Sequence, residues 1–156
     1  MSAELVFNIS QALTAYARCL DEDRLEDWPD FFADDCLYRI SSAQNMRDGY
    51  EASLVFLNSK GMVRDRVSAL RQANIYERQA YRHLIGQPFL VSHEAGRVVS
   101  EAPFMVARIM RDGTTDVFAT GFYRDTWRLC AGKLDLIERI VICDSSRIDT
   151  LLALPL

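Results

Sequence analysis

Apolar residues recur every three or four positions over the first 20 residues of the chain, which is the spacing of a helix with one buried face. Asp21, Glu22 and Asp23 follow this pattern, and acidic groups oppose the helix dipole at the C-terminal end of a helix. We therefore predict a helix that ends in this acidic corner. Its buried face would consist of Leu5, Ile9, Leu13, Tyr16 and Leu20.

A second, shorter helix is predicted directly after this corner. Pro29 would lie in its first turn, where the missing N–H group is tolerated. Asp34 and Asp35 are predicted to end and cap the helix, and a strand is expected to begin with residues 36–40. Adjacent carboxylates could suggest acid–base chemistry or a metal, but helix termination is the simpler role. The aromatic side of the short helix, expected to pack in the core, would consist of Trp28, Phe31 and Phe32.

The middle of the chain alternates between polar and apolar stretches. Residues 41–49 have the composition of a loop, and residues 50–57 are ambiguous between a strand and a helix. Residues 59–72 are predicted to form another helix, whereas residues 74–80 are polar and irregular. One side of the predicted helix would consist of Met62, Val63, Arg66, Val67 and Leu70.

The second half of the chain is rich in Val, Ile, Phe and Thr and is divided by turn residues. Segments 94–96, 111–113 and 131–132 each contain a glycine, which favours the positive φ of a hairpin turn. Three successive hairpins imply an antiparallel meander of long strands. The predicted strand blocks are Arg82–Ser92, Arg97–Met110, Thr115–Arg128 and Lys133–Asp144.

The last of these blocks alternates along its length, which predicts a strand with both faces partly covered. One face would carry Leu134, Leu136, Ile140 and Ile142, and the other Asp135, Ile137, Arg139 and Val141.

These elements together predict an α+β fold in which the N-terminal helices pack in the concave face of a long, curved and mostly antiparallel sheet. One domain would span residues 1–156, with residues 145–156 as a C-terminal docking tail. Five of the last six residues are apolar, so the tail is expected to dock on its own domain or on a neighbouring chain. Leu154 and Leu156 are therefore candidate interface residues.

Composition and charge exclude several functions. The net charge is −4 and basic residues are interleaved with acidic ones, so no basic stripe is present to bind a nucleic acid. No apolar run approaches the ~20 residues of a membrane-spanning helix, and no signal-peptide pattern is seen, so we expect no membrane partner and a cytoplasmic location. The chain contains four cysteines, expected to be reduced and buried: Cys19, Cys36, Cys130 and Cys143.

Several blocks in a fixed order carry a family resemblance. The helix, short helix and strand of residues 20–40 resemble the cone-shaped α+β domains of the nuclear-transport-factor-2-like superfamily. The Arg-Val-x-x-Leu-Arg pattern within residues 61–71 and the Tyr-Arg-His-Leu segment at 81–84 resemble the small (β) subunits of Rieske aromatic-ring-hydroxylating oxygenases. Within that family, residues 140–145 and 149–156 look most like the small subunits of terephthalate 1,2-dioxygenases. Small subunits of salicylate 5-hydroxylases and of one group of anthranilate dioxygenases are similar.

The resemblance implies a non-catalytic, structural β subunit of an α3β3 hexamer that oxidises an aromatic carboxylate. Terephthalate is the first expectation, with salicylate or anthranilate as alternatives. The expected partners are sister β subunits and a large α subunit, which in this family holds a Rieske [2Fe–2S] cluster and a mononuclear Fe(II). A reductase supplies electrons to the complex.

The chain's own histidines and cysteines agree with this division of labour. It has only two histidines, His83 and His93, and neither Cys19 nor Cys36 has a histidine nearby. A Rieske cluster needs two Cys and two His, and an iron facial triad needs two His and a carboxylate. We therefore predict no catalytic, cofactor-binding or metal-binding residue in this chain.

The remaining candidate site residues are mostly basic. Arginines on the predicted helix 59–72 suit bidentate carboxylate pairing across a subunit interface, although a solvated helix face with weak ion pairs is the alternative. His83 is expected to hold the sheet to a partner subunit or to a loop of its own chain, and His93 is expected in a surface turn. Besides Leu154 and Leu156, the interface candidates are Lys60, Arg64, Arg66, Arg71, Arg82 and His83.

A function of another class stays open. His83 could act as a general base in a stand-alone cone-fold dehydratase or isomerase, with Asp34 or Asp35 and a tyrosine as its partners. An isolated chain whose activity is lost on His83→Ala would favour this enzyme. Activity that appears only with a large subunit would favour the structural subunit.

Overall fold

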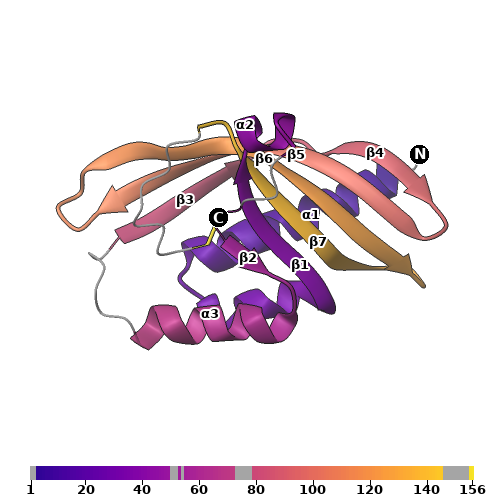
Figure 1. Ribbon diagram of the computed structural model, residues 1–156, viewed down its shortest axis with the longest axis horizontal. Coiled ribbons are helices and arrows are strands. Elements are labelled where there is room, and N and C mark those ends of the chain that lie inside the picture. The colour runs from indigo at the N-terminus through magenta and orange to yellow at the C-terminus, as the bar shows by residue number, and fades with distance from the viewer. Residues whose placement is uncertain (1–2, 50–52, 54, 73–78, 146–154) are drawn as a thin grey trace.

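The computed structural model describes residues 3–49, 53, 55–72, 79–145 and 155–156 (Figure 1). No helix among these residues is long and apolar enough to cross a membrane. In chain order the elements are α1 (Ala3–Asp21), η1 (Leu25–Phe31, a 3₁₀ helix), β1 (Phe32–Ser42), α2 (Ala43–Arg47), β2 (Val55–Leu57), α3 (Lys60–Gln72), β3 (Gln79–Ile85), β4 (Phe89–Glu94), β5 (Arg97–Met110), β6 (Thr115–Cys130) and β7 (Lys133–Cys143).

The described strands form one curved, mixed sheet with helices on its concave side. The strand order is β2-β1-β7-β6-β5-β3, and β4 also pairs with β5. The β1–β7 pair is parallel, and the other pairs are antiparallel. Helix α1 packs against β3, and α3 packs against β1 and η1 (Figure 1). The predicted α+β cone, with its meander of β5, β6 and β7, is confirmed.

The predicted apolar face of the first helix is confirmed. All five residues of that face are buried on α1, because the helix lies against the sheet. Near its C-terminal end, the ring of Tyr16 makes edge-to-face contacts with Phe31 and Phe32, at centroid distances of 5.6 and 6.2 Å. Trp28 and Phe32 are fully buried in the core, and Phe31 is partly buried. The aromatic side of the short helix therefore packs as predicted.

The prediction that Asp34 and Asp35 end the short helix is wrong. Helix η1 ends at Phe31, and both aspartates lie exposed within β1. The pairing of β1 with β7 is irregular here, because four residues between Phe32 and Leu37 face a single residue of β7. This bulge releases the two carboxylates toward solvent, so polar residues are tolerated inside the strand.

Two other boundaries differ from the prediction. Residues 41–49 were expected to form a loop, but Ser41 and Ser42 belong to β1, and the short helix α2 follows. The hydroxyl of Ser42 caps α2 by accepting from the backbone N–H of Asn45 at 3.1 Å. Of the ambiguous residues 50–57, Val55–Leu57 form the short strand β2. Most of residues 74–80 lie outside the described residues.

The strand predicted for Arg82–Ser92 is in fact two strands, β3 and β4, which pair with opposite halves of β5. Gly86 lies between them, where an added Cβ would overlap the ring of Pro103 on β5. Pro88 lacks a backbone N–H and cannot extend the ladder. The Gly-Gln-Pro segment at residues 86–88 was the sequence signal for this break, because glycine and proline commonly interrupt strands.

A bulge in β7 changes which side chains face the interior. Glu138 pairs with Thr126 and Leu136 pairs with Trp127, so Ile137 is an extra residue in β7. An extra residue reverses the alternation of side chains beyond it. Leu136 and Arg139 are consequently buried on the same inner side, whereas the uninterrupted alternation placed them on opposite faces.

The helix predicted for residues 59–72 is present as α3. Ser59 caps it, since its hydroxyl accepts from the backbone N–H of Met62 at 3.1 Å. Val63, Val67 and Leu70 are buried as predicted, but Met62 is 38% exposed.

All four cysteines carry free thiols, which agrees with the predicted reduced state. Cys19, Cys36 and Cys143 are buried, but Cys130 is exposed because it lies at the end of β6, next to the hairpin turn. The prediction that all four are buried is wrong for Cys130.

Candidate functional site

A buried ion pair lies inside the cone. Arg139 of β7 donates from Nε and Nη2 to the two carboxylate oxygens of Asp125 on β6, at 2.8 and 2.7 Å. The two residues lie opposite each other in the β6–β7 ladder, and their side chains are 0% and 1% exposed. Removing two charges from water is unfavourable, and a bidentate geometry recovers much of that cost. Each of the two charges is therefore tolerated in the interior only while the other is present.

Two tyrosine rings enclose the guanidinium group of Arg139. Its Cζ atom lies 4.1 Å from the ring centroid of Tyr16 and 4.0 Å from that of Tyr123. Desolvated cation–π contacts contribute about 2 kcal/mol. Burial opposes the charged form of Arg139, but pairing with Asp125 outweighs it and raises the pKa of the guanidinium above its ordinary value. Arg139 therefore stays charged inside the cone.

Leu156 fills another part of the same interior. Tyr16 and Tyr38 donate their hydroxyl groups to its main-chain oxygen at 3.0 and 2.8 Å, and its N–H donates to the oxygen of Tyr38 at 3.2 Å. Burial raises the pKa of Tyr38 well above its ordinary value, so this hydroxyl keeps its proton. The Leu156 side chain is fully buried. The tail was predicted to dock on its own domain or on a neighbouring chain, and Leu156 docks on its own domain. Leu154 lies outside the described residues.

Arg139 and Asp125 were not singled out from the sequence. Alternation alone placed Arg139 on the face opposite Leu136 and Ile140, and the bulge at Ile137 is what turns it inward. The available signal was a charged pair, one residue in each of two adjacent apolar strand blocks. Recognising it requires the β6–β7 register, which the hairpin turn at residues 131–132 fixes.

His83 is buried and joins the sheet to the end of α1. Its Nδ1 atom lies 2.6 Å from Oδ1 of Asp21, and its backbone N–H also donates to that carboxylate. A carboxylate can only accept, so Nδ1 carries the hydrogen. Arg82 lies 3.7 Å from the same carboxylate. The contact made by His83 is within its own chain, but with the end of helix α1 rather than with the predicted loop, and a contact of His83 with a partner subunit stays a prediction. His93 is exposed, though it lies in β4 rather than in a turn.

The side chains required for the alternative enzyme do not come together. Asp34 lies 3.6 Å from the ammonium group of Lys60, and Asp35 accepts from Arg128 at 3.0 Å. Both aspartates are exposed on β1, whereas His83 is paired with Asp21 on α1. The predicted grouping of His83 with Asp34 or Asp35 is therefore absent from the structure.

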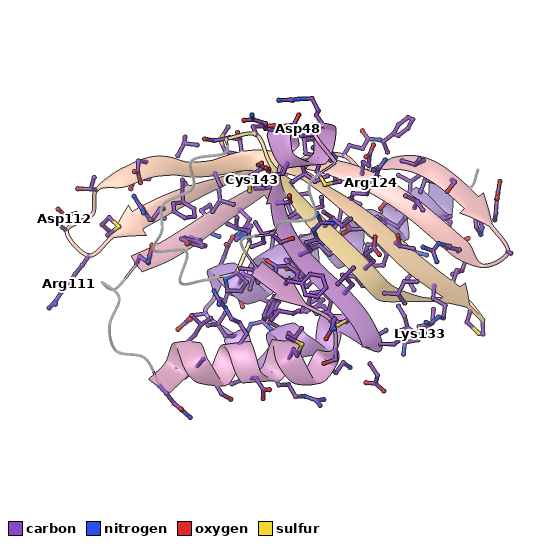
Figure 2. The ribbon with its side chains drawn as sticks, in the orientation of Figure 1. Asp48, Arg111, Asp112, Arg124, Lys133 and Cys143 are labelled. Atoms are coloured by element: carbon purple, nitrogen blue, oxygen red, sulfur yellow. The ribbon has the colours of Figure 1, made fainter. Side chains whose placement is uncertain are left out.

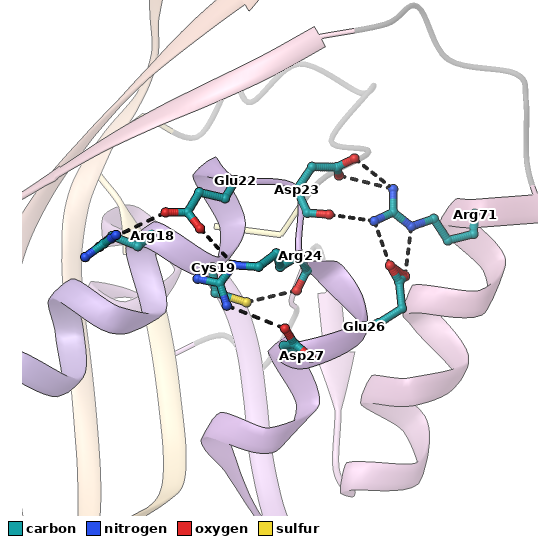
Figure 3. Close-up of polar contacts among 8 residues, drawn as sticks. All are labelled: Arg18, Cys19, Glu22, Asp23, Arg24, Glu26, Asp27 and Arg71. Carbon is teal, nitrogen blue, oxygen red and sulfur yellow. Dashed lines mark hydrogen bonds and ion pairs between the residues drawn. The ribbon is translucent and has the colours of Figure 1, made fainter.

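The basic residues of α3 differ in their surroundings. Arg71 donates to both carboxylate oxygens of Glu26 at 2.9 Å and to Asp23 at 3.1 Å, which ties α3 to the corner after α1 (Figure 3). The side chain of Lys60 is 18% exposed, Arg64 is exposed, and Arg66 is partly buried. Their part in an interface stays a prediction.

An apolar surface on the outer face of the sheet was not predicted. Leu84 pairs with Met105 across β3 and β5, and both side chains are exposed, at 64% and 43%. They point away from α1, because the neighbouring residue His83 faces it. Further exposed apolar residues on β4 and β6 are Phe89, Val91 and Val117. The signal for this surface was present, since the predicted strands carry apolar residues at successive positions.

The described residues contain no group of three or more His, Cys, Asp or Glu side chains placed to hold a metal ion. His83 is already paired and His93 is alone on the surface, so these residues do not fit a Rieske cluster or a mononuclear iron.

Comparison with known proteins supplies the family. The model of the SnoaL-like domain matches residues 1–140. One relative is terephthalate 1,2-dioxygenase from a Comamonas species, whose terminal oxygenase component contains a chain named subunit beta 1. That subunit is 50% identical to this chain over 142 residues, or 91% of this chain and 92% of the relative. The chain belongs to the β subunits of aromatic-ring-hydroxylating dioxygenases.

Two further relatives agree with this assignment of the β subunit. The small subunit of anthranilate 1,2-dioxygenase from Burkholderia cepacia is 37% identical over 96% of this chain and 93% of its own. A crystal structure from Novosphingobium aromaticivorans, described as a β subunit of an aromatic-ring-hydroxylating dioxygenase, superposes with a TM-score of 0.87. It is 42% identical and covers 95% of this chain and 94% of its own.

Proposed function

We propose that this chain is the β subunit of an oxygenase that converts terephthalate to a cis-dihydrodiol. The main support for terephthalate as the substrate is the 50% identity to a terephthalate 1,2-dioxygenase β subunit over nearly the full length of both chains. Anthranilate is the second candidate, because an anthranilate 1,2-dioxygenase small subunit is 37% identical over a similar length. Salicylate, expected from the sequence as a further alternative, stays a prediction.

The proposed assembly is an α3β3 hexamer. The large subunit would hold the Rieske [2Fe–2S] cluster and the mononuclear Fe(II), and a reductase would supply electrons to the complex. This chain would act as a scaffold in the cytoplasm, where it fixes the positions of the large subunits. The absence of an iron-binding group among its described residues is compatible with this arrangement.

The surfaces proposed for assembly are the basic side of α3 and the apolar outer face of the sheet. Arg64 is exposed and free to reach a partner's carboxylate, whereas Arg71 is already engaged by Asp23 and Glu26. Leu84 and Met105 offer apolar area of the kind that stable subunit interfaces bury. One domain over residues 1–156, with residues 145–156 as a docking tail, remains part of the proposal.

A scaffold role is also supported by the interior of the cone. Arg139 and Asp125 form an ion pair, and tyrosine rings enclose the guanidinium group. The hydroxyl groups of Tyr16 and Tyr38 donate to the main-chain oxygen of Leu156. None of these polar groups is left exposed to act as an acid or base on a substrate.

Co-expression with a large subunit tests the proposal. The purified complex should have the mass of three copies of each chain by light scattering, and it should take up oxygen with terephthalate faster than with anthranilate or salicylate. The isolated chain should show no uptake with any of them. Oxygen uptake by the isolated chain would contradict the scaffold role, and a preference for anthranilate would replace the proposed substrate.

His83→Asn provides the matched control against the alternative enzyme. The amide nitrogen of Asn can still donate to Asp21, while the imidazole needed for acid–base chemistry is gone. Once assembly is confirmed, we expect turnover within about twofold of the unaltered complex, since the His83 side chain is buried and its Nδ1 atom is already paired with Asp21. A loss of turnover in an intact hexamer would favour a catalytic histidine.

A further inference from the structure

A pocket of about 200 Å³ opens beside the buried ion pair. It lies between α1, η1 and the start of β7, where Lys133 marks one end of the strand and Cys143 the other (Figure 2). The exposed residues Asp30 and Lys133 lie at its mouth, and the buried residues Tyr16, Phe32 and Arg139 line its inner end. The pocket therefore leads from solvent to the side chains that enclose the guanidinium group, which is itself inaccessible.

The inner end carries a hydrogen-bond donor without a partner. Asp125 takes the Nε and Nη2 nitrogens of Arg139, and the third nitrogen, Nη1, is buried with no hydrogen-bond partner in the described part of the chain. Leaving a buried donor of a charged group unpaired is unfavourable by several kcal/mol in general. The pocket provides the space in which an acceptor atom could satisfy it.

Size and lining limit what can enter. A dry cavity of ~150 Å³ is large enough to hold benzene. The present pocket is only slightly larger and is walled by aromatic and aliphatic side chains, among them Phe31, Phe32, Trp127 and Leu136. One six-membered aromatic ring with a small substituent fits this volume.

The fixed charges disfavour an anion. Asp125 neutralises Arg139 behind the pocket, and Asp135 lies 3.5 Å from Lys133 at the mouth. Asp30 is left as an additional negative charge on the lining. The ligand should therefore carry a neutral oxygen acceptor rather than a carboxylate, and this separates the pocket from an aromatic-acid substrate site.

We propose that this pocket binds a neutral, single-ring aromatic molecule whose carbonyl oxygen accepts a hydrogen bond from Nη1 of Arg139. It would be a small-molecule site within the β subunit, separate from the oxidation chemistry. The inference concerns the chain's own interior and does not depend on the proposed substrate or hexamer.

Calorimetric titration of the full chain with benzamide tests it, with toluene and benzoate as comparison ligands. Benzamide should bind at one saturable site. Toluene lacks the acceptor, so it should bind about tenfold more weakly, as expected for the loss of a hydrogen bond to a charged donor. Benzoate should also bind more weakly than benzamide. Nuclear magnetic resonance of the Arg139 guanidinium and the Trp127 indole should report the contact directly.

Ala12→Leu is the variant that fills the pocket, since Ala12 lines it from α1. We expect benzamide binding to weaken about tenfold or more, which is the effect of overfilling a packed site. Ala15→Leu is the matched control, because Ala15 is an exposed alanine on the same helix, and it should leave binding unchanged. If Ala12→Leu fails to fold, Leu134→Trp narrows the pocket from β7.

Several outcomes would overturn the proposal. Absence of saturable benzamide binding means that the pocket holds water only. Equal affinity for toluene removes the role of Arg139, and tighter binding of benzoate removes the charge argument. Binding that survives both Ala12→Leu and Leu134→Trp places the ligand elsewhere on the chain.

Discussion

Arg71 and Arg139 make similar contacts in opposite environments. Each donates two hydrogen bonds to one carboxylate, Arg71 to Glu26 and Arg139 to Asp125, at distances between 2.7 and 2.9 Å. The side chain of Arg71 is 36% exposed and that of Glu26 is 63% exposed, whereas Arg139 and Asp125 are inaccessible. The hydrogen-bond geometry of the two pairs is almost the same, but their exposure to water differs.

The difference determines what each pair can contribute. Water screens the charges of the α3 pair and solvates either partner when the other is removed, so such a pair adds little stability. No water can replace a lost partner in the interior pair, so breaking that pair is far more costly than its net contribution when intact. Distance alone therefore does not rank ion pairs, and burial does.

Breaking the interior pair should give the largest effect. Arg139→Leu leaves Asp125 buried without a partner, and we expect the free energy of unfolding to fall by about 3–5 kcal/mol. Urea denaturation of the isolated chain measures this. The double variant Arg139→Leu/Asp125→Leu removes both charges and should recover most of the loss. A double variant as unstable as the single one would show that packing around Tyr16 and Tyr123, not charge, is the cause.

Shortening Leu156 should give the next largest effect. Its side chain is fully buried in its own core, so Leu156→Ala should leave a cavity and lower the free energy of unfolding by about 2–5 kcal/mol. Leu84→Ala is the matched control, because Leu84 is exposed on the outer face of the sheet, and its isolated chain should change little. If both variants retained full stability, Leu156 would not be part of the core.

Removing the exposed pair should have a small effect that depends on pH. Arg71→Ala should lower the free energy of unfolding by about 0.5 kcal/mol at neutral pH. The hydrogen bonds from Arg71 lower the pKa of Glu26 below its ordinary value of 4.5, so the contribution is present above that value. It is lost as the pH falls through the lowered pKa. A denaturation series at several pH values should show the two proteins converging under acidic conditions.

The cysteines allow buried and exposed side chains to be compared by their reactivity rather than by their effect on stability. Burial raises the pKa of Cys143 to about 12 and that of Cys19 to about 11, so neither is a reactive thiolate near pH 8. Cys130 is exposed and should react with iodoacetamide first. Cys130→Ser should abolish this rapid labelling, as read by mass spectrometry, and leave the urea midpoint unchanged. Rapid labelling of Cys143 in the folded chain would contradict its burial.

How much of the molecule the sequence predicts depends on how local the signal is. Three features follow from residue types and spacing over a few residues: the buried face of α1, the turns of the three hairpins, and the aromatic packing of Trp28 and Phe32. The place where β1 begins and the split between β3 and β4 were missed. The start of β1 depends on the irregular pairing of β1 with β7, which the sequence of β1 alone does not contain. The split between β3 and β4 was signalled by Gly86 and Pro88, and the close approach of Pro103 at Gly86 appears only once β5 is in place.

The sequence by itself determined the α+β class, the order of helices before meander, and the family. Each rests on residue types and their spacing, which the linear chain already contains. Only the tertiary structure decided that Arg139 faces inward, that Leu156 ends in its own core, and that Asp34 and Asp35 lie apart from His83. One extra residue in β7 reverses the direction of every side chain beyond it, and pairing between distant strands sets that register.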